Sequence, residues 1–170
     1  MKMIRVEEAV GTILSHDVTQ IIPGEFKGRL FKKGHIIKEE DIEKFEQIIF
    51  EETTTIGIRK QKIGQLHEND AATRISNLVV GEGIKLSDEI KEGKVDFFAD
   101  RDGVLKIDKT NLFKLNSLGE IIVSTIHNNT PIKKGEKVGA TRVIPLIIDE
   151  KKIITAEELI KEKIISVAEI

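Results

Sequence analysis

Apolar and polar positions change their spacing several times along the chain, and each change predicts a different element. Between residues 38 and 49, apolar side chains recur on one helical face behind three acids, which the helix dipole favours in a first turn. A second apolar face predicts a helix from about Glu68 to Val80, and Asp108 is placed to cap a short helix that ends near Leu118. Thr155 opens a capping-box pattern that predicts a final helix.

Alternating and β-branched residues predict short strands between these helices. The most strand-like stretches are Glu120–His127 and Lys137–Ile148. The segment Asp100-Arg101-Asp102-Gly103 has the composition of a hairpin turn, with Val104–Ile107 as the return strand. The succession of elements lacks the β-α-β rhythm of a parallel sheet. The sequence therefore predicts an α+β fold with short mixed or antiparallel strands, a few isolated helices and two sub-domains.

The pattern also predicts where these parts begin and end. Residues 1–65 form an N-terminal region, residues 66–150 form an α+β domain with a polar His/Asn cluster, and residues 151–170 form a helical linker. An apolar stretch follows the last helix, whereas chain ends are more often polar and poorly ordered. We therefore expect a chain that is cut before its next domain. The alternative is that this end packs back on its own domain as a last strand.

Composition narrows the functional classes. The chain has 170 residues, a net charge of −2, seven Phe and neither Trp nor Tyr. These values give no general attraction for phosphate backbones and few faces for base stacking, so no nucleic-acid partner is expected. The lack of cysteine excludes disulfides, thiolate metal sites and cysteine nucleophiles. The sequence has neither a signal-peptide pattern nor an apolar run of membrane-spanning length, which predicts a cytoplasmic protein without a membrane partner.

Two polar stretches set beside apolar segments carry the candidate site, the first from Leu66 to Ile75 and the second from Ser124 to Leu146. Polar groups are costly to desolvate, so they seldom cluster beside core segments without a structural or binding role. We predict that the two stretches lie close in space and form one hydrogen-bonded cluster, with Arg74 or Arg142 as its cation. The candidate ligand-binding residues are His67, Asn69, Asp70 and Arg74 from the first stretch and His127, Asn128, Asn129 and Arg142 from the second.

Metal binding is one chemistry to weigh for this cluster. His67, Glu68 and Asp70, joined by His127, offer nitrogen and carboxylate ligands that suit zinc or manganese. A helix start also recruits acids and amides to its free N–H groups, and this explains the same residues without a metal. We therefore expect no metal site.

Anion binding is the second chemistry. Arg74 and Arg142, together with nearby lysines and amide donors, suit a phosphate or a pterin-like ligand. The alternative is that Lys133, Lys134 and Lys137 keep a sheet edge soluble. No motif of a nucleophile with its base can be found, so the catalytic residues, if there are any, stay unknown.

Three stretches resemble a known family. They are Glu8–Thr19, then Pro23–Arg29 through Gly34–Ile42, and then the two polar stretches. Together they are similar to the N-terminal half of clostridial-type molybdopterin-binding proteins, which are relatives of the MoeA-like molybdopterin molybdotransferases. The resemblance reaches from near the N-terminus to about Asp149.

The resemblance implies where the pterin would be held. Such proteins bind it in a separate α/β domain that begins with a strand and a Thr-Thr-Gly-Ser-Glu-like turn, and this sequence contains no such turn. The family's pterin-binding and metal-insertion residues therefore have no counterpart here. We expect no cofactor in this chain itself, with molybdopterin bound through a missing C-terminal domain that is also its partner.

The resemblance also implies a role and an assembly. We expect a non-catalytic accessory region of a molybdopterin-binding protein linked to molybdenum cofactor biosynthesis. The alternative is an independent small-anion or pterin-binding sensor module. Whether the full-length protein is a molybdotransferase-like enzyme stays open. A homodimer is expected because the relatives are dimeric, and because Ile-rich strands and an apolar C-terminal segment favour cover by a partner.

Overall fold

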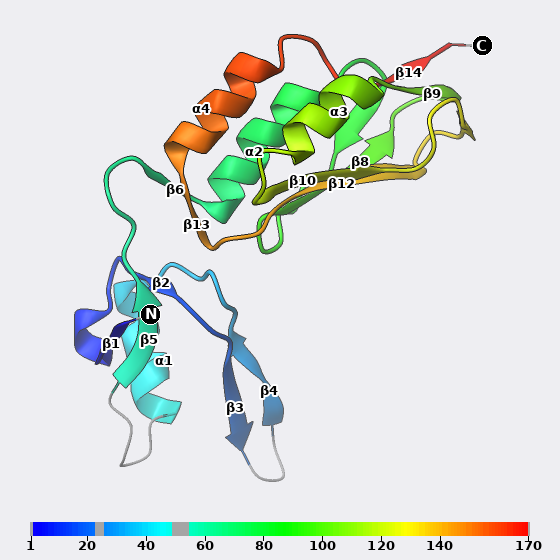
Figure 1. Cartoon of the computed structure of the whole chain (residues 1–170). Helices are drawn as coiled ribbons and strands as arrows, with labels where there is room; N and C mark the ends of the chain where they lie inside the picture. Colours follow the sequence, from blue (N-terminus) through cyan, green and yellow to red (C-terminus); the bar gives the residue numbers. More distant parts are fainter. Residues whose placement is uncertain (1, 23–25, 49–54, 170) are drawn as a thin grey trace. The chain divides into compact units, whose positions relative to one another are not determined.

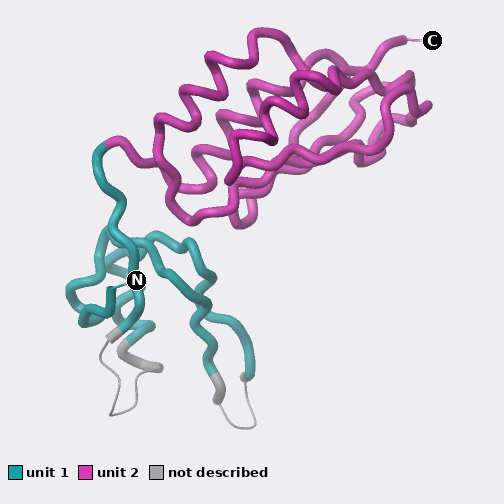
Figure 2. The backbone as a smooth tube through the Cα atoms, viewed as in Figure 1, with its two compact units in different colours: residues 1–63 teal, residues 64–170 magenta. Residues whose placement is uncertain are grey.

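A computed structural model describes residues 2–22, 26–48 and 55–169 of the chain. These residues divide into two compact units, Met1–Ile63 and Gly64–Ile170 (Figure 2). Both units combine helices with small antiparallel sheets, so the predicted α+β fold is confirmed (Figure 1). The boundary predicted near residue 65 lies close to the division between the units.

The first unit is built around a three-stranded sheet in the order β1-β5-β2 and a separate hairpin of β3 and β4. Helix α1 begins at Glu39, as the acidic first turn predicts, and buries Phe45 against Phe31 with ring centroids 4.5 Å apart. The elements of this unit are β1 (Lys2–Arg5), η1 (Val6–Glu8), β2 (Ile13–Leu14), β3 (Val18–Ile22), β4 (Phe26–Phe31), α1 (Glu39–Ile48) and β5 (Thr55–Arg59).

The second unit contains a four-stranded sheet in the order β10-β12-β8-β7, with helices on one of its faces (Figure 1). Helix α2 contacts β12 and β8, whereas α3 contacts β10. The central elements are β6 (Gln65–His67), α2 (Glu68–Val79), β7 (Ile84–Leu86), β8 (Lys94–Ala99), α3 (Lys109–Asn116), β10 (Ile121–Thr125), β12 (Lys137–Val143), β13 (Ile147–Asp149) and α4 (Glu150–Leu159). Strand β13 pairs with β6, which places α4 beside α2.

A second sheet of this unit has the order β11-β9-β14 and consists of β9 (Gly103–Ile107), β11 (Pro131–Ile132) and β14 (Ile165–Ala168). The hairpin predicted at residues 100–103 is therefore wrong, because β8 and β9 belong to different sheets. Gly103 is needed for another reason: a Cβ there would overlap the carbonyl of Ala168 on β14. A local turn signal cannot show that the strand after it leaves the sheet.

The segment after residue 150 is part of the second unit rather than a linker, so the predicted helical linker over 151–170 is wrong. Ile153 and Ala156 of α4 are buried in the core. Strand β14 pairs with β9 on one side, and on the other Ile165 accepts a hydrogen bond from the Gly81 amide at 2.7 Å. The apolar residues of this segment fill the core of their own domain, which was the alternative to a linker.

Candidate functional site

The first polar stretch forms the start of α2. The Nδ1 atom of His67 accepts a hydrogen bond from the amide of Asn69 at 3.2 Å, so this buried histidine is the N-cap of the helix. The side-chain oxygen of Asn69 accepts from the amide of Gly93 at 2.9 Å and ties the helix start to the turn before β8. Asp70 is exposed in the first turn, where the helix dipole favours an acid. Three of the candidates therefore serve the helix start.

Arg74 lies further along α2 and binds two acids of α4. Its Nε and Nη2 atoms donate to the two oxygens of Glu157 at 2.9 and 2.7 Å, and its Nη1 atom donates to Glu150 at 2.8 Å. This paired geometry is the strongest form of an arginine–carboxylate contact. The bond from Arg74 also holds the pKa of Glu157 below its ordinary value. Arg74 thus joins two helices through its Nε, Nη1 and Nη2 atoms.

The second polar stretch closes the sheet that contains β9. The side-chain oxygen of Asn128 accepts from the amide of Ile107 at 2.9 Å, so this side chain continues the hydrogen bonds that β11 makes with β9. Asn129 has a positive φ of 63° and accepts from Lys106 at 2.9 Å. The backbone oxygen of His127 accepts from the hydroxyl of Thr130, and the His127 ring is exposed. These residues shape a turn.

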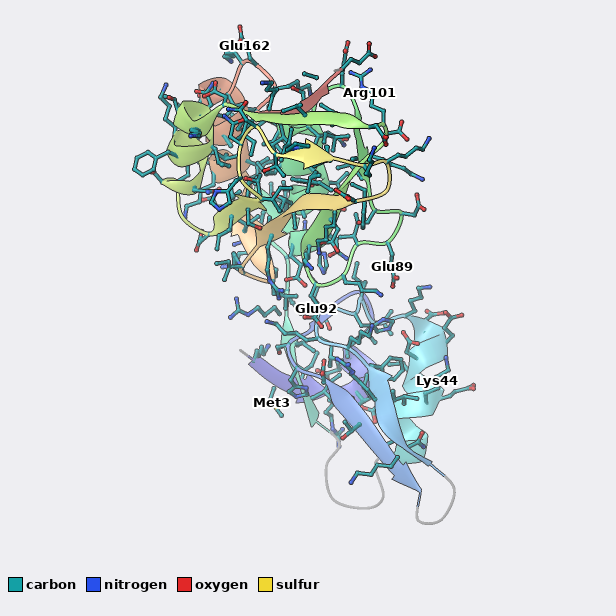
Figure 3. The ribbon with its side chains drawn as sticks, turned by 90° about the vertical axis from the view of Figure 1, so that its right-hand side faces the viewer. Met3, Lys44, Glu89, Glu92, Arg101 and Glu162 are labelled. Atoms are coloured by element: carbon teal, nitrogen blue, oxygen red, sulfur yellow. The ribbon has the colours of Figure 1, made fainter. Side chains whose placement is uncertain are left out.

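The helix start at His67–Asp70 and the turn at His127–Asn129 adjoin opposite ends of β12, so the single cluster that we predicted does not form. Of the candidates from the second stretch, Arg142 alone lies at the end beside the helix start. Arg142 pairs with Lys94 at the β8 end that adjoins Gly93 and Asn69. Gly139, at the other end of β12, pairs with Thr125 just before the His127 turn. Figure 3 shows Glu92 before β8 and Arg101 after it, at the two ends of this unit. Burial in one core did not require the polar residues to meet, because Asn69 and Asn128 each accept from a backbone amide nearby.

The cations proposed for an anion site are each paired with an acid. Arg142 lies 3.7 Å from Glu92, Lys133 lies 2.8 Å from Asp102, and Lys134 lies 3.8 Å from Asp100. They face separate acids rather than one another. The sequence therefore identified the basic residues but not a shared pocket.

One ion-pair group went unnoticed in the sequence. Asp96 on β8 contacts Lys137 at 2.8 Å and Lys94 at 3.0 Å, on the sheet face that the helices do not cover. Burial raises the pKa of Asp96, but the bonds from Lys137 and Lys94 outweigh it and hold the pKa below its ordinary value. Strand alternation placed Lys94 and Asp96 on one face, but their approach to Lys137 depends on the β8–β12 register.

An open depression of about 670 Å³ lies beside this face. The half-buried ring of Phe98 is part of its lining, and Lys85 of β7 and Lys134 also contribute to it. Asp88, Glu89 and Asp100 add negative charge to the same walls. The depression therefore combines one aromatic surface with charges of both signs.

Across ranges 2–22, 26–48 and 55–169, no three His, Asp or Glu side chains are arranged to hold a metal ion. Within the same ranges, no helix combines the length and apolar character needed to cross a membrane.

Comparison with known proteins gives a match for part of the chain. Residues 3–48 match a family described as a domain of unknown function, DUF8806. The match covers the first unit from β1 to the end of α1. No curated protein and no solved structure matches the chain.

Proposed function

We propose that this chain is a non-catalytic accessory region of a molybdopterin-binding protein, linked to molybdenum cofactor biosynthesis, and that it acts by contacting the domain that holds the pterin. The observation that carries the proposal is the use of the candidate residues. His67, Asn69 and Arg74 bond to neighbouring elements, as do Asn128 and Asn129 in the second stretch. Residues used in this way build a framework for a binding surface.

The stretches that carry the family resemblance also form a framework in the first unit. The amide of Leu14 donates to the carbonyl of His35 at 2.9 Å, and the amide of Gly34 donates back to Leu14 at 2.8 Å. Gly11 and Ile37 are joined in the same way at 2.8 Å. Two of the three stretches therefore bond to each other, which is the pattern expected when a resemblance reflects a shared scaffold.

Calorimetry tests the accessory role directly. Titration of the chain with molybdopterin, without oxygen, is expected to show no tight binding. Titration with a purified α/β molybdopterin-binding domain that carries its pterin is expected to show a stoichiometric complex. Tight binding of free molybdopterin would contradict the accessory role, and lack of binding to the loaded domain would contradict the proposed partner.

The depression beside Phe98 favours a second candidate, an independent small-anion or pterin-binding module. An aromatic face suits a flat ring, and Lys85 and Lys134 suit an anionic group. Lys85→Glu should then weaken binding of molybdopterin, while Lys109→Glu, the same change at an exposed lysine of α3, should leave it unaltered. Equal binding by both variants would exclude this depression as the site.

A further inference from the structure

The four-stranded sheet of the second unit has one face that the helices leave open (Figure 1). The strand register shows which side chains lie on this face, because directly paired residues point to the same side of a sheet. These side chains form two rows across β10, β12 and β8, with Ile122, Arg142 and Lys94 in one row and Ser124, Ala140 and Asp96 in the other. Lys137 of β12 reaches the second row through its contact with Asp96.

Cations outnumber acids on this open face. Lys94, Lys137 and Arg142 all expose more than a third of their side chains, whereas Asp96 is the acid that the two rows contain. Glu92 lies at the rim of the face, just before β8, and approaches Arg142 only to 3.7 Å. The chain as a whole has a net charge of −2, so positive charge gathers here against the average of the molecule. Such a surface favours an acidic partner.

Asp96 holds two of these cations beside each other. The Nζ atoms of Lys94 and Lys137 lie 3.0 and 2.8 Å from the same oxygen, Oδ1 of Asp96. One carboxylate offsets only one of the two positive charges, so the repulsion between the ammonium groups is only partly relieved. Each ammonium has three donors, and a bond to one oxygen leaves donors for another acceptor. A second carboxylate, brought by a partner, would therefore stabilise this group.

Exposed aliphatic side chains lie next to the cations. Ile122 of β10 is 44% exposed, and Ile126, four positions later in the alternation, is also exposed. The open face thus has an apolar strip along β10 and a basic strip along β12 and β8. Apolar groups flanked by charged ones are typical of a surface that another protein covers.

The size of the face fits one helix. Three neighbouring strands that are ~4.8 Å apart span about 10 Å, which is the diameter of an α-helix. Helices α2 and α3 already cover the opposite face of the same strands. A helix on the open face would complete a second layer of the same kind.

We propose that this open face docks an acidic amphipathic helix of a partner protein. The aliphatic side chains of that helix pack on Ile122 and Ile126. Its carboxylates lie on the adjacent side and bind Arg142 and the two lysines that Asp96 holds. This inference does not depend on the proposed pterin role.

Fluorescence anisotropy with a labelled synthetic peptide tests the proposal. The probe is a helix of Glu, Ala and Leu, about 18 residues and ~27 Å long, with leucines along one face and glutamates beside them. A peptide of the same composition in scrambled order, without an apolar face, is its control. The ordered peptide should bind saturably at ~0.1 M salt, and the scrambled peptide at least about tenfold more weakly.

Charge reversal tests the basic strip. Lys137→Glu combined with Arg142→Glu should weaken binding of the ordered peptide at least about tenfold, since two charge-assisted contacts are lost. Lys109→Glu with Lys114→Glu reverses two exposed lysines of α3 and should bind as the unaltered chain does.

The apolar strip has its own pair of variants. Ile122→Thr keeps a β-branched side chain in the strand but removes apolar contact, and should weaken binding about three- to fivefold. Ile154→Thr changes an isoleucine of α4 that is 42% exposed and should leave binding unaltered.

Several results would overturn the proposal: no saturable binding of the ordered peptide, equal binding of the scrambled peptide, or unaltered binding by the double charge reversal on the open face. Tighter binding of a single-stranded oligonucleotide, lost in the same double variant, would also overturn it, because the face would then be a phosphate site. If circular dichroism shows that this double variant is unfolded, Lys137→Gln with Arg142→Gln decides instead. Weaker binding by that variant supports the proposal, and equal binding overturns it.

Discussion

The two units differ in how their stability is distributed. The first has a small core in which Phe31 and Phe45 stack, and it buries Asp41, whose carboxylate bonds to His35. The second has a large core dominated by Ile and Val, and its main ion pair joins two helices at a half-exposed position. Small domains bury a smaller share of their surface, so each of their core residues carries more of the total. We therefore expect the first unit to be the more sensitive to single changes.

The largest expected effect is the loss of a buried aromatic ring in either core. Phe45→Ala should cost the first unit about 3–5 kcal/mol, and Phe97→Ala should cost the second unit a similar amount. Because a small domain has little stability to lose, Phe45→Ala should unfold the first unit. The second unit should still fold with Phe97→Ala, but the midpoint of its denaturation should be lower. Hydrogen exchange followed by mass spectrometry separates the two units. Ile154→Ala, at an exposed side chain of α4, is the control and should change little.

A smaller effect is expected from Asp41→Asn. Its carboxylate accepts from the Nε2 atom of His35 at 2.6 Å and from the amide of Lys38 at 3.0 Å, with Lys44 3.9 Å away. Hydrogen bonds to a buried charged group are worth about 1.5–3 kcal/mol, and the first unit should lose about that much above pH 5.

The pH dependence follows from the same residue. Burial raises the pKa of Asp41, but the bonds from His35 and the Lys38 amide outweigh it, so the pKa lies below its ordinary value of 3.8. The unfolded chain therefore binds more protons, and the stabilisation is full above this value and is lost as the pH falls through the folded pKa. The difference between the unaltered chain and Asp41→Asn should shrink from about pH 5 downwards. A constant difference would contradict this origin.

Arg74 and Arg142 of the second unit, which we predicted as alternative cations of the polar cluster, should differ in how much they contribute to its stability. Arg74→Gln breaks the paired contact with Glu157 and the bond to Glu150, and should cost about 1–2 kcal/mol because the pair is partly exposed. Arg142→Gln loses only a 3.7 Å contact with Glu92 at the surface and should cost less than about 0.5 kcal/mol. Chemical denaturation gives both values, and equal costs would place Arg142 in a contact as strong as that of Arg74.

The smallest effects separate the two adjacent asparagines of the β9 turn. Asn128→Ala leaves the Ile107 amide without its acceptor and should cost about 1 kcal/mol. Asn129→Gly loses the bond to Lys106 but relieves a positive φ of 63°, so its net effect should be close to zero. Thermal melting of the two variants compares their stabilities. A larger loss for Asn129→Gly than for Asn128→Ala would show that the bond to Lys106 contributes more than the bond to the Ile107 amide.

Local pattern predicted most of the elements but not the partners of the strands. The helix predicted from Glu68 extends to Val79, and Asp108 caps α3 as expected, because both features depend on neighbouring residues. Strand β10 likewise lies within the predicted Glu120–His127. The partners of β9 lie in β11 and β14, which no local pattern indicates.

The candidate site was predicted in its residues and not in its geometry. The helix start explained the His67 and Asn69 positions, and this alternative to a ligand site was visible in the sequence. The acids that bind Arg74 come from α4, more than seventy positions later in the chain, where only the fold brings them close.

The pairing of β14 with β9 has a consequence for synthesis of the protein on the ribosome. Ile107 pairs with Ile165, so β9 emerges well before the strand that completes its sheet. At ~5–20 residues per second, this strand waits several seconds with one side unpaired. The same holds for Gly81, whose amide bonds to Ile165. The second unit can therefore reach its final packing only after β14 has been translated, and a nascent chain paused earlier would present an open strand to chaperones.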